Sequence, residues 1–158
     1  GEVGHIRLSE DGPEGYGKKG SFEGFCSGGG IKKLAELTAI EYLRENKKSS
    51  LFESEADFSN LTAANIAKAM YEGDEFATAV YKKCAEYLGR GLSVIIDIIN
   101  PEAIVIGSIF ERNEEFFQSE IKEIIENEAL TDNVKSCKIL SAELGESIGD
   151  FASLGLLF

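Results

Sequence analysis

The sequence predicts a helix-rich α/β protein with a small, incomplete sheet. Long amphipathic stretches dominate, and only three short segments have strand character, near residues 3–8, 103–107 and 137–141. The segment 103–107, AIVIG, is nearly all apolar, which is typical of a strand that is buried on both faces. Because so few strands would leave sheet edges unpaired, the chain is predicted to be part of a larger α/β domain.

The composition narrows the class of protein. Apolar residues at 43% and charged residues at 28% are ordinary for a soluble globular protein. The net charge of −12 argues against a nucleic-acid surface, because phosphate contacts need clustered Lys and Arg. No apolar run approaches the ~20 residues of a membrane helix, and no leader opens the sequence. The scattered cysteines, Cys26, Cys84 and Cys137, suit reduced thiols, so we expect a cytoplasmic protein.

Residues 1–30 are rich in glycine and contain the single histidine of the chain. A glycine-rich backbone turns sharply or lets a ligand approach closely. Glu2, His5 and Glu23 have the chemistry to hold a hydroxylated small molecule, because carboxylates accept strong hydrogen bonds and imidazole both donates and accepts. On composition alone, a solvated surface loop explains the stretch equally well.

The next segment reads as two helices joined by a polar loop. Residues 31–45 carry an apolar helical stripe, and Gly28–Gly30 are expected just ahead of this helix. Residues 46–60 are polar and charged, as in a loop. Thr62 is placed to cap a second helix, which Gly73 is placed to end.

Asp74 is expected to cap the longest helix, which Asn100-Pro101 stops. Gly89 and Gly91 lie inside it and weaken a helix, so they are predicted to permit close packing on a neighbour. The predicted apolar face consists of Phe76, Ala77, Val80, Tyr81, Cys84, Tyr87, Leu88, Leu92, Ile95, Ile96 and Ile99.

The remaining chain alternates strands and helices. After the strand at 103–107, residues 113–128 predict an amphipathic helix whose glutamates form a solvated face. Residues 137–141 predict a second strand, and residues 144–158 predict a last helix. The inward positions of the helix 113–128 are Phe116, Phe117, Ile121, Ile124 and Ile125.

Several motifs of residues 1–30 resemble the signature of the ROK family, which comprises bacterial sugar kinases and sugar-responsive repressors. The family reads roughly G-E-x-G-H, then D-G-P, then C-x-C-G-x-x-G-C-x-E and A-S-G. The resemblance implies that Glu2, His5 and Glu23 contact sugar hydroxyls. The matching residues here are Glu2, His5, Asp11-Gly12-Pro13, Gly20, Glu23 and Ser27-Gly28.

The chain departs from the family at its structural zinc site. The three cysteines that join the histidine on zinc are absent: residues 15–17 stand in place of the first two, and Ser21 replaces the third. Without thiolates there is no sulfur-rich tetrahedral site. We therefore expect no bound zinc and assign no metal ligand, while His5 and the two carboxylates are retained.

A second resemblance covers residues 100–108, NPEAIVIGS, where the family reads roughly L-x-P-E-x-I-V-[IL]-G-G. Ser108 replaces the second glycine. Ligands of open α/β sheets bind beyond the carboxyl ends of the strands, and the resemblance places Gly107 and Ser108 near the nucleotide. Without the resemblance, these residues predict only a turn.

The resemblance implies the C-terminal half of an actin-like ATPase (ribonuclease-H-like) domain. Residues 1–30 would form the sugar-binding loop region, 31–73 a helical segment, and 74–158 a helix-strand-helix-strand-helix portion on the nucleotide side. It also implies ATP with Mg²⁺ and transfer of the γ-phosphate to a sugar hydroxyl, as in a glucokinase or N-acetylhexosamine kinase. The catalytic aspartate would lie upstream, so no catalytic residue is expected here and the chain alone is expected to be inactive.

Two alternatives stay open at this point. The chain could be the sugar-sensing half of a ROK repressor, a binding module in which the sugar shifts a conformational equilibrium. It could also be an α/β fragment without activity. The upstream sequence would discriminate, because a phosphate loop favours the kinase and a helix-turn-helix favours the repressor. The expected partners are a sugar, ATP, and either a second copy or the missing N-terminal half.

Overall fold

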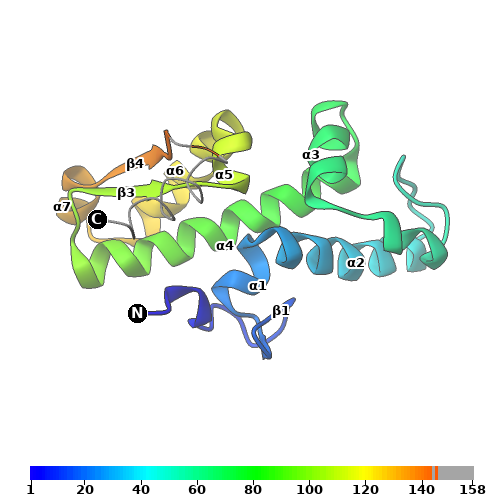
Figure 1. Ribbon diagram of the computed structural model, residues 1–158, viewed down its shortest axis with the longest axis horizontal. Coiled ribbons are helices and arrows are strands. Elements are labelled where there is room, and N and C mark those ends of the chain that lie inside the picture. The colour runs from blue at the N-terminus through cyan, green and yellow to red at the C-terminus, as the bar shows by residue number, and fades with distance from the viewer. Residues whose placement is uncertain (144, 146–158) are drawn as a thin grey trace, which may run out of the picture.

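One long helix runs through the centre of the computed structural model, which describes residues 1–143 and residue 145. In Figure 1 the N-terminal segment, β1 and α1 lie on one side of α4, and β3, β4 and α5–α7 lie on the other. The predicted helix over 144–158 lies outside the described residues, residue 145 excepted. The elements are η1 (Val3–His5), β1 (Glu14–Gly15), β2 (Lys18–Lys19), α1 (Phe22–Cys26), α2 (Gly28–Arg44), η2 (Glu55–Asn60), α3 (Ala63–Tyr71), α4 (Glu75–Ile99), β3 (Ala103–Ile106), α5 (Ile109–Arg112), α6 (Glu114–Glu128), α7 (Thr131–Ser136) and β4 (Lys138–Ser141).

Local chemistry sets both ends of α4, as predicted. Asp74 caps it, with Oδ1 accepting a hydrogen bond of 2.9 Å from the Ala77 N–H. The other carboxylate oxygen accepts one of 2.7 Å from the Ser50 N–H. Partial burial opposes ionisation of Asp74, but these hydrogen bonds outweigh it and lower the pKa of the carboxyl. The helix ends at Asn100, whose left-handed backbone (φ 48°) cannot continue it.

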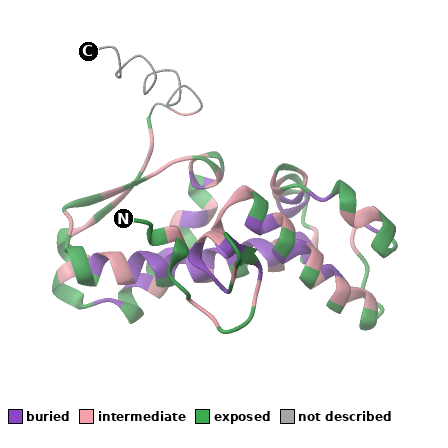
Figure 2. Ribbon diagram, turned by 60° about the horizontal axis from the view of Figure 1, so that its bottom comes forward, coloured by how far each residue is buried: buried purple, intermediate pink, exposed green. Residues whose placement is uncertain are grey.

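The two glycines inside α4 permit close packing, which confirms their predicted role. A Cβ on Gly89 would lie 2.7 Å from Ile124 of α6, and one on Gly91 would lie 2.6 Å from the Phe22 ring of α1. Cys84 is buried, as predicted. Ile99 is the exception on the predicted apolar face: it is 67% exposed, because the described elements leave one side of the last turn of α4 uncovered (Figure 2).

The helices α2 and α3 also match their predictions, with one correction. Thr62 caps α3 with a side-chain hydrogen bond from the Asn65 N–H, and Gly73 follows it with φ 89°. The residues Gly28–Gly30 do not precede α2 but form its first turn. Ser27 is the cap, because its hydroxyl accepts a 3.0 Å hydrogen bond from the Gly30 N–H.

The predicted strand near residues 3–8 is wrong. Residues 3–5 form the 3₁₀ turn η1, and Arg7 contributes only an isolated bridge to Ser21. A strand needs a partner along its length, and the described chain offers this segment only that bridge. A short antiparallel hairpin, β1–β2, follows instead.

The strands β3 and β4 are confirmed and pair in parallel, with Ile104 opposite Ile139. The expectation that β3 is buried on both faces is wrong for the described chain. Ile104 and Ile106 face the core and are half-buried, whereas Val105 is 63% exposed. The described helices cover one face of this two-stranded sheet and leave the other open.

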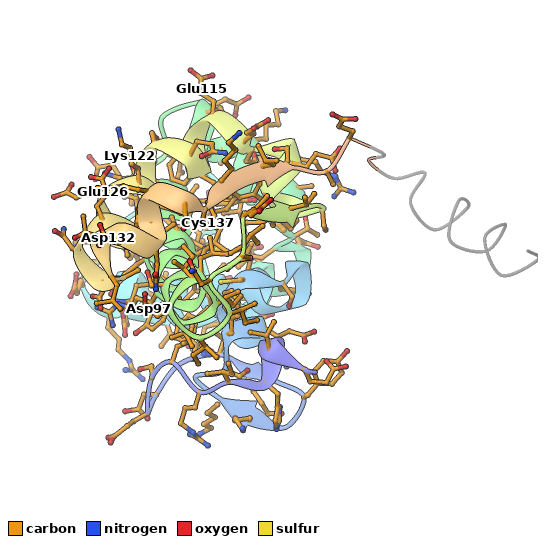
Figure 3. All side chains as sticks on the ribbon, turned by 90° about the vertical axis from the view of Figure 1, so that its left-hand side faces the viewer. Asp97, Glu115, Lys122, Glu126, Asp132 and Cys137 are labelled. Carbon is orange, nitrogen blue, oxygen red and sulfur yellow. The ribbon has the colours of Figure 1, made fainter. Side chains whose placement is uncertain are left out.

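The helix α6 confirms the amphipathic prediction, with Phe117, Ile121 and Ile125 buried. Figure 3 shows the end of the molecule at which the charged side chains of α6, such as Glu126, point away from the core. At this end, Asp97 of α4 accepts a 2.9 Å hydrogen bond from the Leu130 N–H, which links α4 to the segment that follows α6. No helix of the described chain is both long and apolar enough to cross a membrane.

Candidate functional site

The short helix α1 carries Glu23 and is fixed to α4 by two aromatic side chains. Ser21 starts the helix by accepting a 3.1 Å hydrogen bond from the Gly24 N–H. Phe25 stacks on Tyr87 of α4, with ring centroids 3.5 Å apart and an angle of 8° between the rings. Phe22 fills the space that Gly91 leaves on the same helix. Glu23 therefore projects from a rigidly held turn.

The structure brings Glu23 against η1, the turn that contains His5. A Cβ on Gly4 would lie 3.1 Å from Glu23 Oε2, tighter than most van der Waals contacts, so the missing side chain of Gly4 favours this close approach. His5 is exposed, and its backbone carbonyl accepts a 2.8 Å hydrogen bond from Lys18 Nζ. Glu2 lies one residue before η1 and is also exposed. The sugar-binding roles of these three residues stay predictions.

The glycine-rich loop between η1 and α1 is held by its own backbone. The Gly20 carbonyl accepts hydrogen bonds from the N–H groups of Leu8 (2.8 Å) and Ser9 (3.1 Å), and the Gly20 N–H donates to the Pro13 carbonyl. Gly20 has φ 66°, and a Cβ there would overlap the Ser9 carbonyl oxygen. The glycine is thus required by both its conformation and its surroundings.

The segment that replaces the family's first two cysteines is the turn of the β1–β2 hairpin, with exposed Tyr16 at its tip. Within the described residues, no three side chains of His, Cys, Asp or Glu are grouped so that they could hold a metal ion.

We predict that protein purified after growth with zinc contains far less than one zinc per chain. Metal analysis by mass spectrometry checks this, and one tightly held zinc per chain would contradict it.

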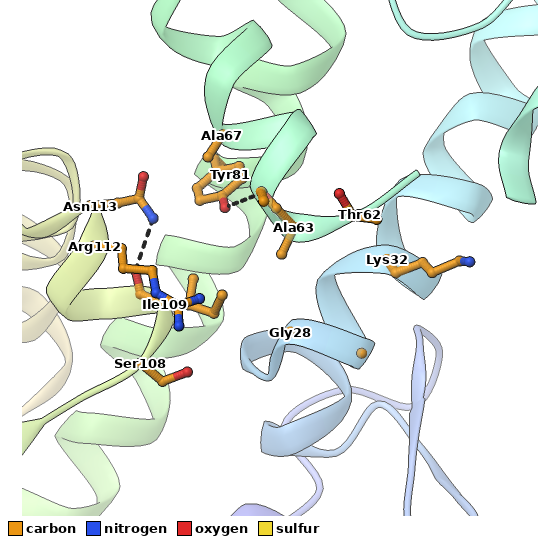
Figure 4. Close-up of a pocket in the computed structure, with 12 residues that line it drawn as sticks. Gly28, Lys32, Thr62, Ala63, Ala67, Tyr81, Ser108, Ile109, Arg112 and Asn113 are labelled. Carbon is orange, nitrogen blue, oxygen red and sulfur yellow. Dashed lines mark hydrogen bonds between the residues drawn. The ribbon is translucent and has the colours of Figure 1, made fainter. Parts of the chain in front are cut away.

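A cavity of about 570 Å³ opens where α2, α3 and α5 approach one another over α4 (Figure 4). Its size lies in the range of small-molecule sites. Ser108, predicted to lie near a nucleotide, lines it; Gly107 precedes that residue at the end of β3. The lining residues are Gly28, Gly29, Lys32, Thr62, Ala63, Ala64, Ala67, Tyr81, Ser108, Ile109, Arg112 and Asn113.

The deep wall of this cavity is fixed by internal hydrogen bonds. The Tyr81 hydroxyl donates to the Ala63 carbonyl at 2.8 Å, and burial raises the pKa of this phenol. Asn113 donates from Nδ2 to the Ile109 carbonyl at 2.9 Å. At the exposed side of the cavity, Lys32 donates to the Ser59 carbonyl at 3.2 Å. The sequence indicated Thr62 only as a helix cap and gave no signal for Lys32 as a lining residue.

Ser108 has a backbone conformation that side chains rarely adopt, with φ 60° and ψ −120°. This position starts α5 immediately after β3, at the cavity. The glycine of the family pattern would adopt this conformation without strain, so Ser108 keeps the backbone path of that pattern and adds a hydroxyl at the cavity wall. In Figure 4 this hydroxyl lies on the side of the cavity that faces Gly28.

Comparisons with known proteins agree with this architecture. The chain is 32% identical over 151 residues to a glucokinase of Halalkalibacterium halodurans, covering 94% of the chain and 44% of that protein. It is 27% identical over 154 residues to the transcriptional regulator NagC of Escherichia coli, covering 96% of the chain and 36% of the relative. The chain thus spans about half or less of the length of these relatives.

A solved structure extends the comparison to the fold. The ROK family glucokinase of Streptomyces griseus, in complex with glucose and AMPPNP, superposes with a TM-score of 0.75 at 24% identity, over 98% of this chain and 50% of that one. The likeness confirms the predicted fold, a helix-rich portion of an actin-like ATPase domain. The model of the ROK family matches residues 1–154. The chain therefore belongs to the ROK family.

Proposed function

We propose that the chain forms the sugar- and nucleotide-binding portion of an ATP-dependent sugar kinase, similar to a glucokinase or N-acetylhexosamine kinase. The observation that carries this proposal is the junction at Ser27. This residue ends α1, which carries Glu23, and caps α2, whose first turn lines the cavity. A sugar held by Glu23 and a nucleotide in the cavity would lie on either side of one rigid junction, as phosphoryl transfer requires.

The cavity fits a nucleotide by its chemistry. Ala64, Ala67 and Ile109 provide an apolar wall for a purine ring, and the Ser108 hydroxyl can bond to a ribose. The N–H groups at the start of α2, a helix of 17 residues, favour phosphate there. No carboxylate lines the cavity in the described part of the chain, so we assign no residue here to Mg²⁺.

On the sugar side, Glu2, Glu23 and His5 would orient the sugar rather than react. The carboxylates accept hydrogen bonds from sugar hydroxyls, and His5 donates or accepts. The base that takes the proton of the attacking hydroxyl would come from the remainder of a ROK-length polypeptide. Catalysis of this kind rests mainly on positioning and charge stabilisation.

The first test uses the full-length gene product and a panel of glucose, N-acetylglucosamine and N-acetylmannosamine. We expect one of these sugars to support ADP release, and Glu23→Gln to lower kcat/KM about 10- to 150-fold, the loss of one charged hydrogen bond. Glu126→Gln is the matched control, because Glu126 is exposed on α6. Wild-type turnover that Glu23→Gln leaves unchanged would refute the assigned role of Glu23.

The second test addresses the nucleotide. Ala67→Trp fills the cavity from α3 and is expected to weaken AMPPNP binding at least about 10-fold in calorimetric titration. Ala56→Trp adds the same side chain at an exposed position of η2 and should leave the affinity unchanged. Equal affinity in both variants, with both folded by circular dichroism, would place the nucleotide outside this cavity.

A second candidate function is favoured by the similarity to NagC over 154 residues. In that case the same loop would bind a sugar without phosphoryl transfer, and binding would shift a conformational equilibrium. The two functions separate in one experiment. Sugar binding by the full-length protein without ADP release, together with DNA binding that the sugar weakens, supports the repressor.

A further inference from the structure

A second cavity, of about 710 Å³, lies between the glycine-rich loop, the C-terminal half of α2 and the middle of α4. It shares no lining residue with the first cavity and includes none of Glu2, His5 and Glu23. The proposed kinase function therefore does not use it. Its size is sufficient for a ligand the size of a monosaccharide derivative.

The floor of the second cavity is apolar and aromatic, with one polar atom. Phe25, Leu34 and Tyr87 line it, and all three are buried. Tyr87 is only 7% exposed, and its hydroxyl has no hydrogen-bond partner among the described residues. This oxygen is not one of the enclosed polar atoms without a partner in the described chain, so it can be reached from solvent and could bond to a ligand in the cavity.

Charged side chains of both signs surround this floor. Lys19, Arg44 and Lys83 provide positive charge, and Asp11 and Glu41 provide negative charge. Lys83 is paired with Glu86 at 2.9 Å. Lys19 and Arg44 have no hydrogen-bond or ion-pair partner within the described residues. With Lys83 paired, two cations and two carboxylates remain around the cavity, so its charges balance in a chain with a net charge of −12.

We propose that this cavity binds a phosphorylated polyhydroxyl compound with the chemistry of a sugar phosphate. Lys19 of β2 and Arg44 at the end of α2 would pair with the phosphate. Asp11 and Glu41 would accept hydrogen bonds from hydroxyls. The apolar floor would lie against the C–H groups of the ligand, within reach of the Tyr87 hydroxyl.

The combination of groups distinguishes this ligand class from simpler ones. A bare inorganic anion would gain nothing from the two carboxylates and would be repelled by them. A neutral sugar would leave Lys19 and Arg44 unused. A compound that carries both a phosphate and hydroxyls can use the two cations and the two carboxylates at the same time.

The test is calorimetric titration of the 158-residue chain with glucose 6-phosphate, glucose and inorganic phosphate. It is repeated with AMPPNP and glucose present to occupy the proposed kinase site. We expect one site for glucose 6-phosphate that these additions do not block, and weaker binding of the other two probes. A failed kinase proposal would leave this outcome unchanged, because the two cavities share no residue.

Variants locate the site. The double substitution K19Q/R44Q removes two exposed cations that line the cavity. It should weaken glucose 6-phosphate binding at least about 10-fold. Tyr87→Phe keeps the stacked ring and should weaken it about 3-fold or more. The control K122Q/K135Q removes two exposed cations elsewhere and should change nothing. Absence of binding, affinity unaffected by K19Q/R44Q, or equal affinity for inorganic phosphate would each overturn the proposal.

Discussion

The substitution Phe25→Ala is expected to lower the free energy of unfolding by about 3–5 kcal/mol. Phe25 is 2% exposed, and its ring stacks on the Tyr87 ring with the two centroids 3.5 Å apart. On another side it touches the loop, since a Cβ on Gly12 would overlap the ring. Three elements therefore meet on one side chain, and its removal leaves a cavity that none of them can close without moving. Urea denaturation followed by circular dichroism measures the loss.

Tyr71→Ala is the matched control, because this aromatic side chain ends α3 and is 62% exposed. Its effect should stay within about 0.5 kcal/mol. If Phe25→Ala cost less than about 1 kcal/mol, the stack between α1 and α4 would not hold the loop as described.

Gly30→Ala is expected to destabilise the protein by about 3 kcal/mol, at the upper end of overpacking costs. A Cβ on Gly30 would overlap the Gly24 carbonyl oxygen and lie 2.5 Å from the Glu23 carbonyl oxygen. Both are backbone atoms of α1, so no side-chain rotation relieves the clash. The variant must move α1 away from α2, and sugar affinity should fall with stability because Glu23 moves with the helix.

Gly29→Ala gives the opposite result in the same turn of α2. A Cβ on Gly29 meets nothing within 4 Å, so the substitution should raise stability by up to about 1 kcal/mol through helix propensity. Thermal and urea denaturation of both variants compare them directly. Two changes of the same sign would contradict the close crossing of α1 and α2.

Features that depend on neighbouring residues in the sequence could be predicted. Thr62 and Asp74 cap helices, and Gly73 and Asn100 end them, because capping is decided within a few residues. The tight packing at Gly89 could be predicted from the cost of glycine in a helix. The resemblance to the family motifs also indicated the loop before Glu23 and the turn at Ser108 as candidate parts of a binding site.

Features that depend on contacts between distant parts of the chain could not be predicted from the sequence. Residues 3–8 have strand character, but the described chain offers them a single bridge, to Ser21, and η1 forms instead. The first cavity combines Lys32, Ala67 and Ser108 from three elements, and no spacing in the sequence links them. The second cavity has no signal in the sequence either, because Tyr87 fits the pattern of an apolar helical face.

The open face of the β3–β4 sheet bears on how the protein behaves at high concentration. Val105 and Leu140 leave this face apolar, and in the described chain the sheet has only two strands. Such a face can pack on apolar surfaces of other molecules, and the unpaired edges of the sheet can add their strands. The net charge of −12 opposes their approach by long-range repulsion, which salt screens over about 10 Å at 0.1 M. At low ionic strength this repulsion keeps the molecules of the isolated chain apart. At high ionic strength the repulsion is screened, and the chain is expected to associate more readily.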